Sequence, residues 1–463
     1  MSTTVAVHEI HTENPATGAP LRTYRAHSPQ EIDQTLDRVH AGFARHPFDA
    51  LAERGQALHR VAAALRERKA SLAAVITAEM GKPITESEAE IEKCAWTCDY
   101  YADHASSSLA DEIVESNAAR SFIAFRPLGV VLAIMPWNFP FWQLFRAAAP
   151  ALMAGNAMVL KHAINVTECA LEIERLFAAC GFEDVFATIL VASREMDTIV
   201  ADPRIAAVTL TGSEGAGSAV AAVAGKHIKK TVLELGGSDA FIVLADADLD
   251  EAATVAVRSR FQNTGQSCIA AKRFIVEEPV YDRFVSAFVE KTKQLVAGDP
   301  RERTTQIGPL ARADLRDSLE RQVAASLAAG AKAALGAHRL DRPGHYYAPT
   351  IVVEVEPGMP MFDQETFGPA AAVIRARDTD HAVELANRSN FGLGGNLWTR
   401  DLERAQRLAE RLESGAVFIN GMTASDARLP FGGVKHSGYG RELSYVGIRE
   451  FVNIQTVWIG PAK

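Results

Sequence analysis

From about residue 121, short runs rich in β-branched and aromatic residues alternate with longer segments of helical periodicity. The runs are "GVVLAIMP", "NAMVLKHA", "FATILVAS", "AAVTLTGS", "TVLELGG" and "DAFIVLAD", and a second series contains "AAVIRARDT", "GGNLWTR" and "GAVFING". Strands that alternate with helices are typical of βαβ units, whose parallel sheets are covered on both faces. The pattern therefore predicts an α/β protein with two such domains.

The N-terminal third is predicted to be mostly helical. Segment 51–81 carries apolar residues at helical spacing, and Gly81 followed by Pro83 marks the end of that pattern. No Gly/Ser linker, low-complexity tract or short-period repeat interrupts the 463 residues. We therefore expect the domains to be fused tightly and to share a cleft.

The charge and cysteine content narrow the classes of function. The 57 acidic and 48 basic residues give a formal net charge of −9, which argues against nucleic acid as a partner. No apolar run approaches the roughly 20 residues of a membrane span, and no secretory signal is visible, so we expect a cytoplasmic protein. The five cysteines lack Cys-x-x-Cys spacing and the histidines are not clustered, so we expect free thiols and no metal site.

The segment "FQNTGQSCIAAKRFIV" (261–276) places Cys268 at the end of a polar run that contains a glycine. Such a run favours a loop and supplies hydrogen-bond donors, which suits an accessible thiolate. A lone cysteine is more often inert than nucleophilic, so both interpretations stay open for this segment alone.

Three further segments each have a chemical and a structural interpretation. "TGSEGAG" (211–217) follows a strand and opens a helix, where a phosphate can bind, but it lacks the Walker A and GxGxxG patterns and can equally be a tight turn. "LELGG" (233–237) puts Glu234 at the carboxyl end of a strand, where open α/β sheets bind ligands, although a solvated acid is commoner. "MPWNFP" (135–140) brackets Asn138 with prolines, which orient an amide or simply stiffen a buried loop.

Together these segments resemble one family. "PWNFP", "TGS", "LELGG", "NTGQSC", "QETFGP" (364–369) and "PFGGVKHSGYG" (430–440) match in order and spacing the signatures of the aldehyde dehydrogenase superfamily, from "NPATG" (14–18) nearly to the C-terminus. Within that superfamily, "KHA", "QNTGQ" and "ASDAR" are most similar to bacterial NAD(P)-dependent succinate-semialdehyde dehydrogenases.

The resemblance implies a Rossmann-like cofactor domain, a catalytic α/β domain and a small β-arm used for oligomerisation. The arm would pair edge strands between subunits of a homodimer or homotetramer. The expected boundaries are 1–115 and 130–234 for the cofactor domain, 235–425 for the catalytic domain, and 116–129 with 446–463 for the arm.

The resemblance also implies the catalytic roles. Cys268 would add to the carbonyl of a small aldehyde as a thiolate. The side-chain amide of Asn138 and the backbone N–H of Cys268 would stabilise the oxyanion of the resulting thiohemiacetal. After hydride transfer, Glu234 would activate the water that hydrolyses the thioester.

For the cofactor, the resemblance implies NAD or NADP. The residues expected to contact it are Ile134, Met135, Pro136, Trp137, Lys161, Gly212, Ser213, Leu235, Glu365 and Phe367. Strictly NAD-using relatives carry an acid three residues after the lysine, where a carboxylate binds the ribose hydroxyls and repels a 2′-phosphate. Ile164 stands at that position, so we expect use of either cofactor.

For the substrate, the resemblance implies that Arg146 binds the distal carboxylate of succinate semialdehyde, because a planar guanidinium suits a carboxylate. Trp142 adds an apolar wall, and Gln262 stands where those enzymes carry a second arginine. Arg428, with Ser425 beside it, would compensate for that loss. Other short-chain or aromatic aldehydes, acyl transfer to coenzyme A, and a non-catalytic role remain alternatives.

Overall fold

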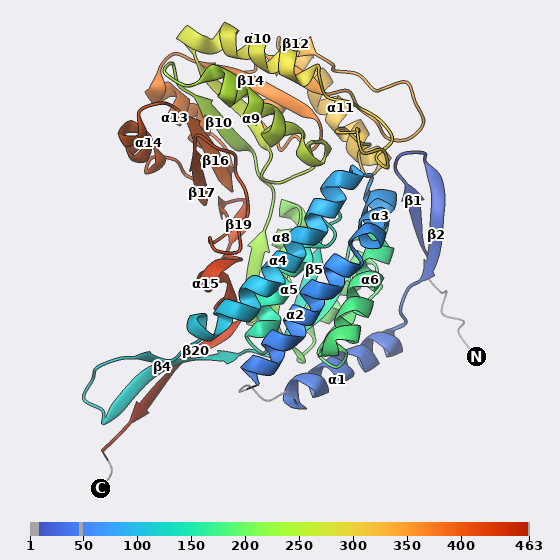
Figure 1. Ribbon diagram of the computed structural model, residues 1–463, viewed down its shortest axis with the longest axis vertical. Coiled ribbons are helices and arrows are strands. Elements are labelled where there is room, and N and C mark those ends of the chain that lie inside the picture. Colours follow the sequence, from blue (N-terminus) through green and yellow to red (C-terminus); the bar gives the residue numbers. More distant parts are fainter. Residues whose placement is uncertain (1–8, 46–49, 462–463) are drawn as a thin grey trace.

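The computed structural model of the protein describes residues 9–45 and 50–461. Two parallel sheets with helices packed against them form the lower and upper bodies in Figure 1, and a narrow β-ribbon extends away from the lower body. The expected α/β class is therefore confirmed. Of the expected domain ranges, residues 1–8, 46–49 and 462–463 lie outside the described part.

The first sheet has the strand order β19-β9-β8-β5-β6-β7. Its strands are β5 (Val130–Met135), β6 (Ala157–His162), β7 (Phe186–Thr188), β8 (Ile205–Thr211), β9 (Lys230–Glu234) and β19 (Gly438–Tyr439). All of them are parallel except β19, which joins the edge antiparallel to β9. The connecting helices are α5 (Trp142–Met153), α6 (Thr167–Phe177), α7 (Met196–Ala201) and α8 (Glu214–Lys226).

The N-terminal helices pack with this sheet into one apolar core. They are α1 (Pro29–Arg45), α2 (Leu51–Glu67), α3 (Lys69–Met80) and α4 (Ile84–Ser108). Segment 51–81 is helical as expected but is interrupted at Arg68, and Gly81 ends it with a φ of 82°. A hairpin of β1 (Glu9–Asn14) and β2 (Ala19–Arg25) precedes the helices, a feature that the helical periodicity did not indicate.

The second sheet has the order β12-β13-β14-β11-β10-β16-β17, with an apolar cluster on each of its faces. Its strands are β10 (Asp239–Val243), β11 (Ala271–Glu277), β12 (Lys332–Leu335), β13 (Thr350–Val353), β14 (Ala370–Ala376), β16 (Gly394–Trp398) and β17 (Ala416–Ile419). The helices are α9 (Leu249–Phe261), α10 (Tyr281–Thr292), α11 (Ala313–Ala328), α12 (Pro360–Asp363), α13 (Thr379–Asn387) and α14 (Leu402–Ala409), and a small ladder joins β15 (Phe391–Gly392) to β18 (Val434–Lys435).

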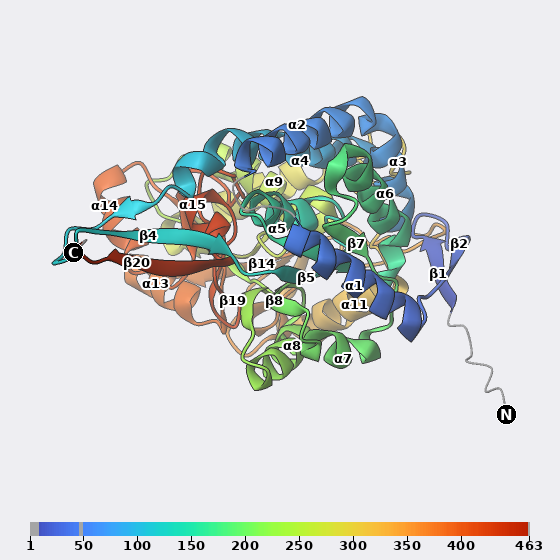
Figure 2. The ribbon, with the colours of Figure 1, turned by 90° about the horizontal axis from the view of Figure 1, so that it is seen from below.

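The projecting ribbon consists of β3 (Glu112–Ile113), β4 (Arg120–Pro127) and β20 (Val452–Ile459). In Figure 2, β4 and β20 run side by side away from the body, and they pair antiparallel along their whole length. Two details differ from the expected arm. Strand β3 lies before residue 116, and residues 446–448 belong to α15 (Ser444–Ile448), which packs on α4 and α5.

Within residues 9–45 and 50–461, no helix combines the length and apolarity needed to cross a membrane.

The two bodies meet at the carboxyl edge of the first sheet. Strands β5, β6, β8 and β9 are parallel, so their last residues lie along one edge, where α/β proteins bind ligands. The loop that carries Cys268 precedes β11 of the second sheet. A Cβ added to Gly237, just after β9, would lie only 2.5 Å from the carbonyl oxygen of Cys268. The glycine therefore permits the contact that joins the two sheets.

Candidate active site

The loop before Cys268 has an unusual backbone. Asn263, Thr264 and Gly265 are consecutive residues in the left-handed region, with φ values of 54°, 54° and 71°. Asparagine and glycine tolerate this conformation, whereas a β-branched threonine rarely adopts it. Backbone strain of this kind persists only when the surroundings fix it, and it clusters at functional sites.

Two buried cationic side chains hold this loop by hydrogen bonds to its backbone carbonyls. The guanidinium of Arg260 donates to the carbonyls of Gly265 at 3.0 Å and Ala271 at 3.0 Å. The Nζ of Lys272 donates to the carbonyls of Ser267 at 2.7 Å and Cys268 at 2.6 Å. Both cations donate hydrogen bonds to backbone carbonyls, so the loop is held at several points.

Cys268 differs from the other four cysteines, which are fully buried, because part of its surface is accessible. Burial nevertheless raises the pKa of its thiol to about 12, while the positive charges of Arg146 and Lys272 act in the opposite direction. The thiol is therefore protonated at neutral pH in this structure. Forming the thiolate requires a base or an additional positive charge nearby.

Asn138 is buried in the loop after β5 and belongs to a network of amides. Its Nδ2 donates to the backbone carbonyl of Gln266 at 3.1 Å, and its backbone carbonyl accepts from the Nδ2 of Asn263 at 2.8 Å. The side chain of Gln143 donates to the Oδ1 of Asn138 at 3.4 Å. One Nδ2 hydrogen of Asn138 remains for a further acceptor, in an orientation that the network fixes.

His162 holds the same loop from the end of β6. Burial lowers the pKa of His162 to about 4, so the imidazole is neutral. Its Nε2 lies 2.8 Å from the carbonyl oxygen of Pro140 and donates to it, while its Nδ1 accepts from the backbone N–H of Ala163 at 2.9 Å. This histidine is a positioning residue that the sequence reasoning missed; its place beside Lys161 in the "KHA" segment was the available signal.

Glu234 ends β9, beside Thr211 in the register of the sheet, and it is 1% exposed. Neither of its carboxylate oxygens has a hydrogen-bond partner among the described residues. Burial, together with the negative charge of Glu442, raises its pKa well above the usual range. A buried carboxyl group without a partner is costly unless a ligand or water completes it, so Glu234 is suited to proton transfer.

Arg146 is buried at the expected place on α5, but its charge is already compensated. Its Nε forms an ion pair with Glu442, and its Nη2 donates to the hydroxyl of Thr211 at 3.4 Å. The guanidinium also lies 4.3 Å from the ring centroid of Phe431. Because of this pairing, Arg146 alone does not supply an unbalanced positive charge. The sequence did not indicate the pairing.

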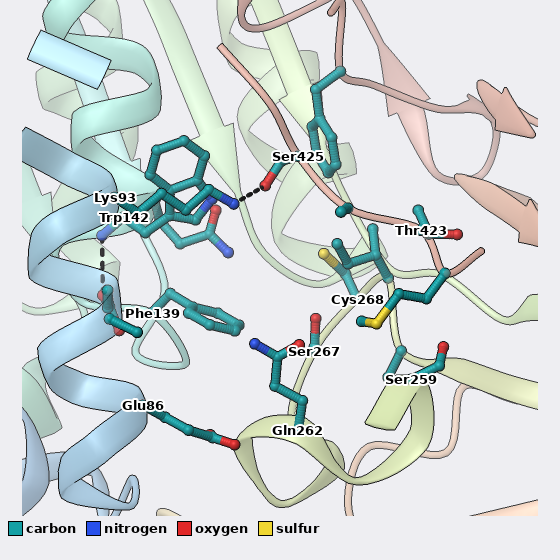
Figure 3. Close-up of a pocket in the computed structure, with 18 of the residues that line it drawn as sticks. Glu86, Lys93, Phe139, Trp142, Ser259, Gln262, Ser267, Cys268, Thr423 and Ser425 are labelled. Atoms are coloured by element: carbon teal, nitrogen blue, oxygen red, sulfur yellow. Dashed lines mark hydrogen bonds between the residues drawn. The ribbon is translucent and has the colours of Figure 1, made fainter. Parts of the chain in front are cut away.

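A cavity of about 290 Å³ opens beside Cys268 (Figure 3). Of the predicted residues it is lined by Cys268, Arg146, Trp142, Gln262 and Ser425, and Glu86, Lys93, Phe139 and Thr423 are among the others. Neither Glu234 nor Asn138 is among the lining residues. The expectation for Arg428 is corrected: its guanidinium pairs with Asp426 and its side chain is 67% exposed, outside this cavity.

The residues expected to bind the cofactor lie along the carboxyl edge of the first sheet. Ile134 and Met135 end β5, and Lys161 lies beside Ile134 in the register of β6. Gly212 and Ser213 connect β8 to α8, and the hydroxyl of Ser213 caps this helix by accepting from the N–H of Ala216 at 3.3 Å. A strand edge that leads into a helix N-terminus suits a pyrophosphate.

The other expected cofactor residues lie where the two bodies meet. Pro136 and Trp137 follow β5, and Trp137 packs edge-on against Phe367, with ring centroids 5.6 Å apart. Glu365 accepts from the N–H of Gly237 at 3.0 Å and lies 3.4 Å from the Nζ of Lys272. Leu235 is buried directly after β9.

A larger cavity of about 880 Å³ has Lys161, Ile164, Ser193, Arg194 and Arg312 among its lining residues. Residue 164 is an isoleucine, so this position supplies no carboxylate, and its side chain is 52% exposed. Together, the cavity, the helix N-terminus and the row of strand ends fit a dinucleotide. Lys161 offers positive charge to a phosphate, whereas Arg194 pairs with Glu195 of the same wall at 3.2 Å.

The fold and the site define an aldehyde dehydrogenase. A model described as "Aldehyde dehydrogenase family" matches residues 3–457, so the chain belongs to this family. Among its relatives is the Synechocystis protein "Probable succinate-semialdehyde dehydrogenase (NADP(+))", 52% identical over 451 residues, which are 97% of this chain and 99% of that protein. Succinate-semialdehyde dehydrogenase (NADP+) 1 of Mycobacterium tuberculosis is 50% identical over 454 residues, 97% of this chain and 99% of that protein.

A solved structure agrees with these relatives. The succinic semialdehyde dehydrogenase of Streptococcus pyogenes, in complex with NADP+ as the cofactor, superposes with a TM-score of 0.95 and 38% identity, over 98% of this chain and 100% of that chain. The resemblance inferred from the motifs is therefore confirmed.

Proposed function

We propose that the protein oxidises succinate semialdehyde to succinate with NADP+ or NAD+. The observation that carries the proposal is the accessible thiol of Cys268 at the wall of a small cavity whose far side holds cationic and hydroxyl groups. The names of the relatives support the same substrate. A carboxylate group on the aldehyde matches those cationic and hydroxyl groups.

In this mechanism the thiol of Cys268 loses its proton to water, the thiolate adds to the aldehyde carbon, and the carbonyl oxygen becomes an oxyanion. The remaining Nδ2 hydrogen of Asn138 and the backbone N–H of Cys268 stabilise that charge, which is worth about 3 kcal/mol of barrier per donor in comparable sites. A bound nicotinamide cofactor would supply the acceptor for the hydride that leaves the same carbon. A thioester on Cys268 is left.

Hydrolysis of the thioester releases the acid and restores the thiol. In the proposal, Glu234 takes a proton from water, the resulting hydroxide adds to the thioester carbonyl, and the sulfur leaves. The unpartnered carboxyl group of Glu234 supports this role. It also favours water over coenzyme A as the acyl acceptor.

NADP+ is the better supported of the two cofactors. Lys161 lines the larger cavity, and Ile164 stands where a carboxylate would repel a 2′-phosphate. The residues proposed to hold the cofactor are those of the strand edge, Ile134 to Trp137, Lys161, Gly212 and Ser213, together with Leu235, Glu365 and Phe367.

The proposed setting is the cytoplasm, and the proposed assembly is a homodimer or homotetramer. Ile454, Trp458 and Ile459 of β20 are exposed apolar side chains on a strand at the edge of its sheet. Exposed strand edges with apolar side chains are normally covered by a partner.

A panel of aldehydes tests the proposal. The purified protein should oxidise succinate semialdehyde with a kcat/KM at least about 100-fold above that for butanal, because a site built for a charged group rejects an analogue without it. The assay follows NAD(P)H with each cofactor, and product analysis with and without coenzyme A distinguishes succinate from succinyl-coenzyme A. Equal rates for both aldehydes, or a strict need for coenzyme A, would overturn the proposal.

A further inference from the structure

The charges around the smaller cavity do not balance. The pairing of Arg146 with Glu442 leaves no net charge at the base of the cavity. Glu90 forms an ion pair with Lys82 and accepts the N–H groups of Phe141 and Trp142. The two charges within each pair balance. An anionic substrate must therefore find its counter-charge elsewhere in the cavity wall.

Lys93 supplies such a charge. It projects from α4 toward Ser425, and its Nζ donates to the hydroxyl oxygen of Ser425 at 2.7 Å (Figure 3). The same nitrogen lies 4.1 Å from the ring centroid of Trp142. The ion pairs of the described residues do not include Lys93, and the nearby Asp426 pairs with Arg428. Lys93 is therefore a cation that lines the cavity without a carboxylate partner.

We propose that Lys93, together with the hydroxyl of Ser425, binds the distal carboxylate of the substrate and so selects aldehydes that carry one. Because Ser425 accepts from Lys93, its own hydroxyl hydrogen is free to donate, and the ammonium retains two further hydrogens. Both groups can therefore bond one carboxylate. This inference rests on the proposed function and assigns the selectivity to Lys93, with Arg146 shaping the wall.

The surroundings of Lys93 favour an anion. Burial and the positive charge of Arg146 lower the pKa of Lys93 to about 8, and a bound carboxylate would relieve this cost. Glu86 is a carboxyl group in the same cavity, and burial raises its pKa to about 7, which reduces its repulsion of an anion below that pH. The bridge between Lys93 and Ser425 thus places an unbalanced positive charge next to an apolar ring.

Arg258 is the competing cation. It lies on α9, is exposed, and lines the same cavity. An exposed guanidinium is well hydrated and screened by salt, so it attracts anions to the entrance more than it fixes one in place. Lys93, partly buried and already oriented by Ser425, is better placed to fix the carboxylate.

The test replaces Lys93 with methionine, which keeps the length and removes the charge. Lys93→Met should raise KM for succinate semialdehyde about 10- to 100-fold, the range expected for a lost charge-assisted hydrogen bond. KM for butanal should change less than about threefold, because butanal has no carboxylate to lose. Lys93→Arg should retain most of the preference. Lys69→Met is the matched control, because Lys69 is a surface residue of α3 that pairs with Glu92.

The pH profile adds a readout that a structural role would not change. The titratable and charged groups that face Lys93 or share its cavity are Arg146 of α5, Glu86, Glu90 and Cys94 of α4, Asp426 of the loop after β17, Arg258 of α9, and Cys268. Because the ammonium loses its proton as pH rises through about 8, KM for the semialdehyde should rise above that pH in the wild type. Lys93→Met should lack the rise near pH 8 and keep only the rise near pH 7 that ionisation of Glu86 causes, and KM for butanal should stay flat in both.

The outcomes distinguish a failure of the proposed function from a failure of the inference about Lys93. If the wild type does not prefer succinate semialdehyde to butanal, the proposed function fails. If the wild type prefers it and Lys93→Met keeps the preference, the function stands and the inference about Lys93 is wrong; loss of the preference in Arg258→Met alone would assign it to Arg258. Equal losses for both aldehydes together with a lower melting temperature would show a structural role and also overturn the inference.

Discussion

At the scale of single residues, the site contains a carboxyl group and a thiol whose pKa values lie above their usual ranges. Burial raises the pKa of the Cys268 thiol and of the Glu234 carboxyl group. Glu234 acts as a base only after it loses its proton. Both halves of the reaction should therefore become faster as pH rises, the first with loss of the Cys268 proton and the second with loss of the Glu234 proton.

Two variants, Glu234→Gln and Cys268→Ala, separate hydride transfer from hydrolysis of the thioester. Glu234→Gln should still release about one NAD(P)H per active site in a rapid burst and then stall, because the thioester forms but water is not activated. In the wild type, steady-state kcat should rise with pH, since a carboxyl group with a raised pKa becomes a base only at higher pH. Rapid-mixing absorbance at 340 nm measures the burst, and Cys268→Ala should show neither phase. Sustained turnover by Glu234→Gln near the wild-type rate would contradict the assigned role.

The residues that the sequence could identify are those in short motifs. Cys268, Glu234 and Asn138 stand in segments whose composition already suggests a loop or a strand end. The partnership of Arg146 with Glu442 was not visible, because the two residues are far apart in the chain and an arginine on a helix looks the same whether or not it is paired. Lys93 was missed for the same reason: it occupies a helix without a motif, and only the fold brings it to Ser425.

At the scale of elements, two glycines of "LELGG" permit its contacts with the second body, one with Glu365 and the other with the nucleophile loop. A Cβ on Gly236 would approach the carboxylate of Glu365 to 2.7 Å, and one on Gly237 would approach the carbonyl of Cys268 to 2.5 Å. The second contact involves backbone that Arg260 and Lys272 already fix. Even a methyl group would therefore shift the nucleophile.

Gly237→Ala should lower kcat/KM about 100-fold, since a displacement of about 1 Å of a catalytic group has an effect of that size. The matched control is Gly225→Ala in α8, where no atom of the described residues lies within 4 Å of the new Cβ beyond the backbone of the helix itself and the neighbouring residues. That variant should be fully active and no less stable, because alanine loses less backbone entropy than glycine in the last turn of a helix. Kinetics and thermal melting of both variants check the prediction, which equal activities would refute.

The order of the elements was easier to predict than their ends. Alternating apolar runs indicated the strands of both sheets because parallel strands buried on both faces have continuous apolar sequences. The break at Arg68 and the early end of β7 at Thr188 depend on packing between distant segments. The periodicity of a single segment contains no such information.

At the scale of the whole molecule, the β-ribbon has more apolar surface than a solitary strand pair can keep exposed. Ile454, Thr456 and Trp458 alternate with Gln455 and Val457 along β20 and so share one face. The double variant Ile454→Lys with Trp458→Lys should reduce the assembly to a smaller species, measured by light scattering after size exclusion. Gln455→Lys, on the other face, is the control. An unchanged mass in the double variant would show that this face is not an interface.

The return of the chain to the first sheet has a consequence for biosynthesis. Ser425, Glu442 and β19 all come from the last tenth of the sequence, yet they bridge to Lys93, pair with Arg146 and border Glu234. During translation the N-terminal body can form first, as domains generally do. Its pocket then has an unneutralised arginine and an uncovered sheet edge until the final residues leave the ribosome. A prematurely terminated chain is therefore not a weaker enzyme but an inactive protein with an aggregation-prone edge.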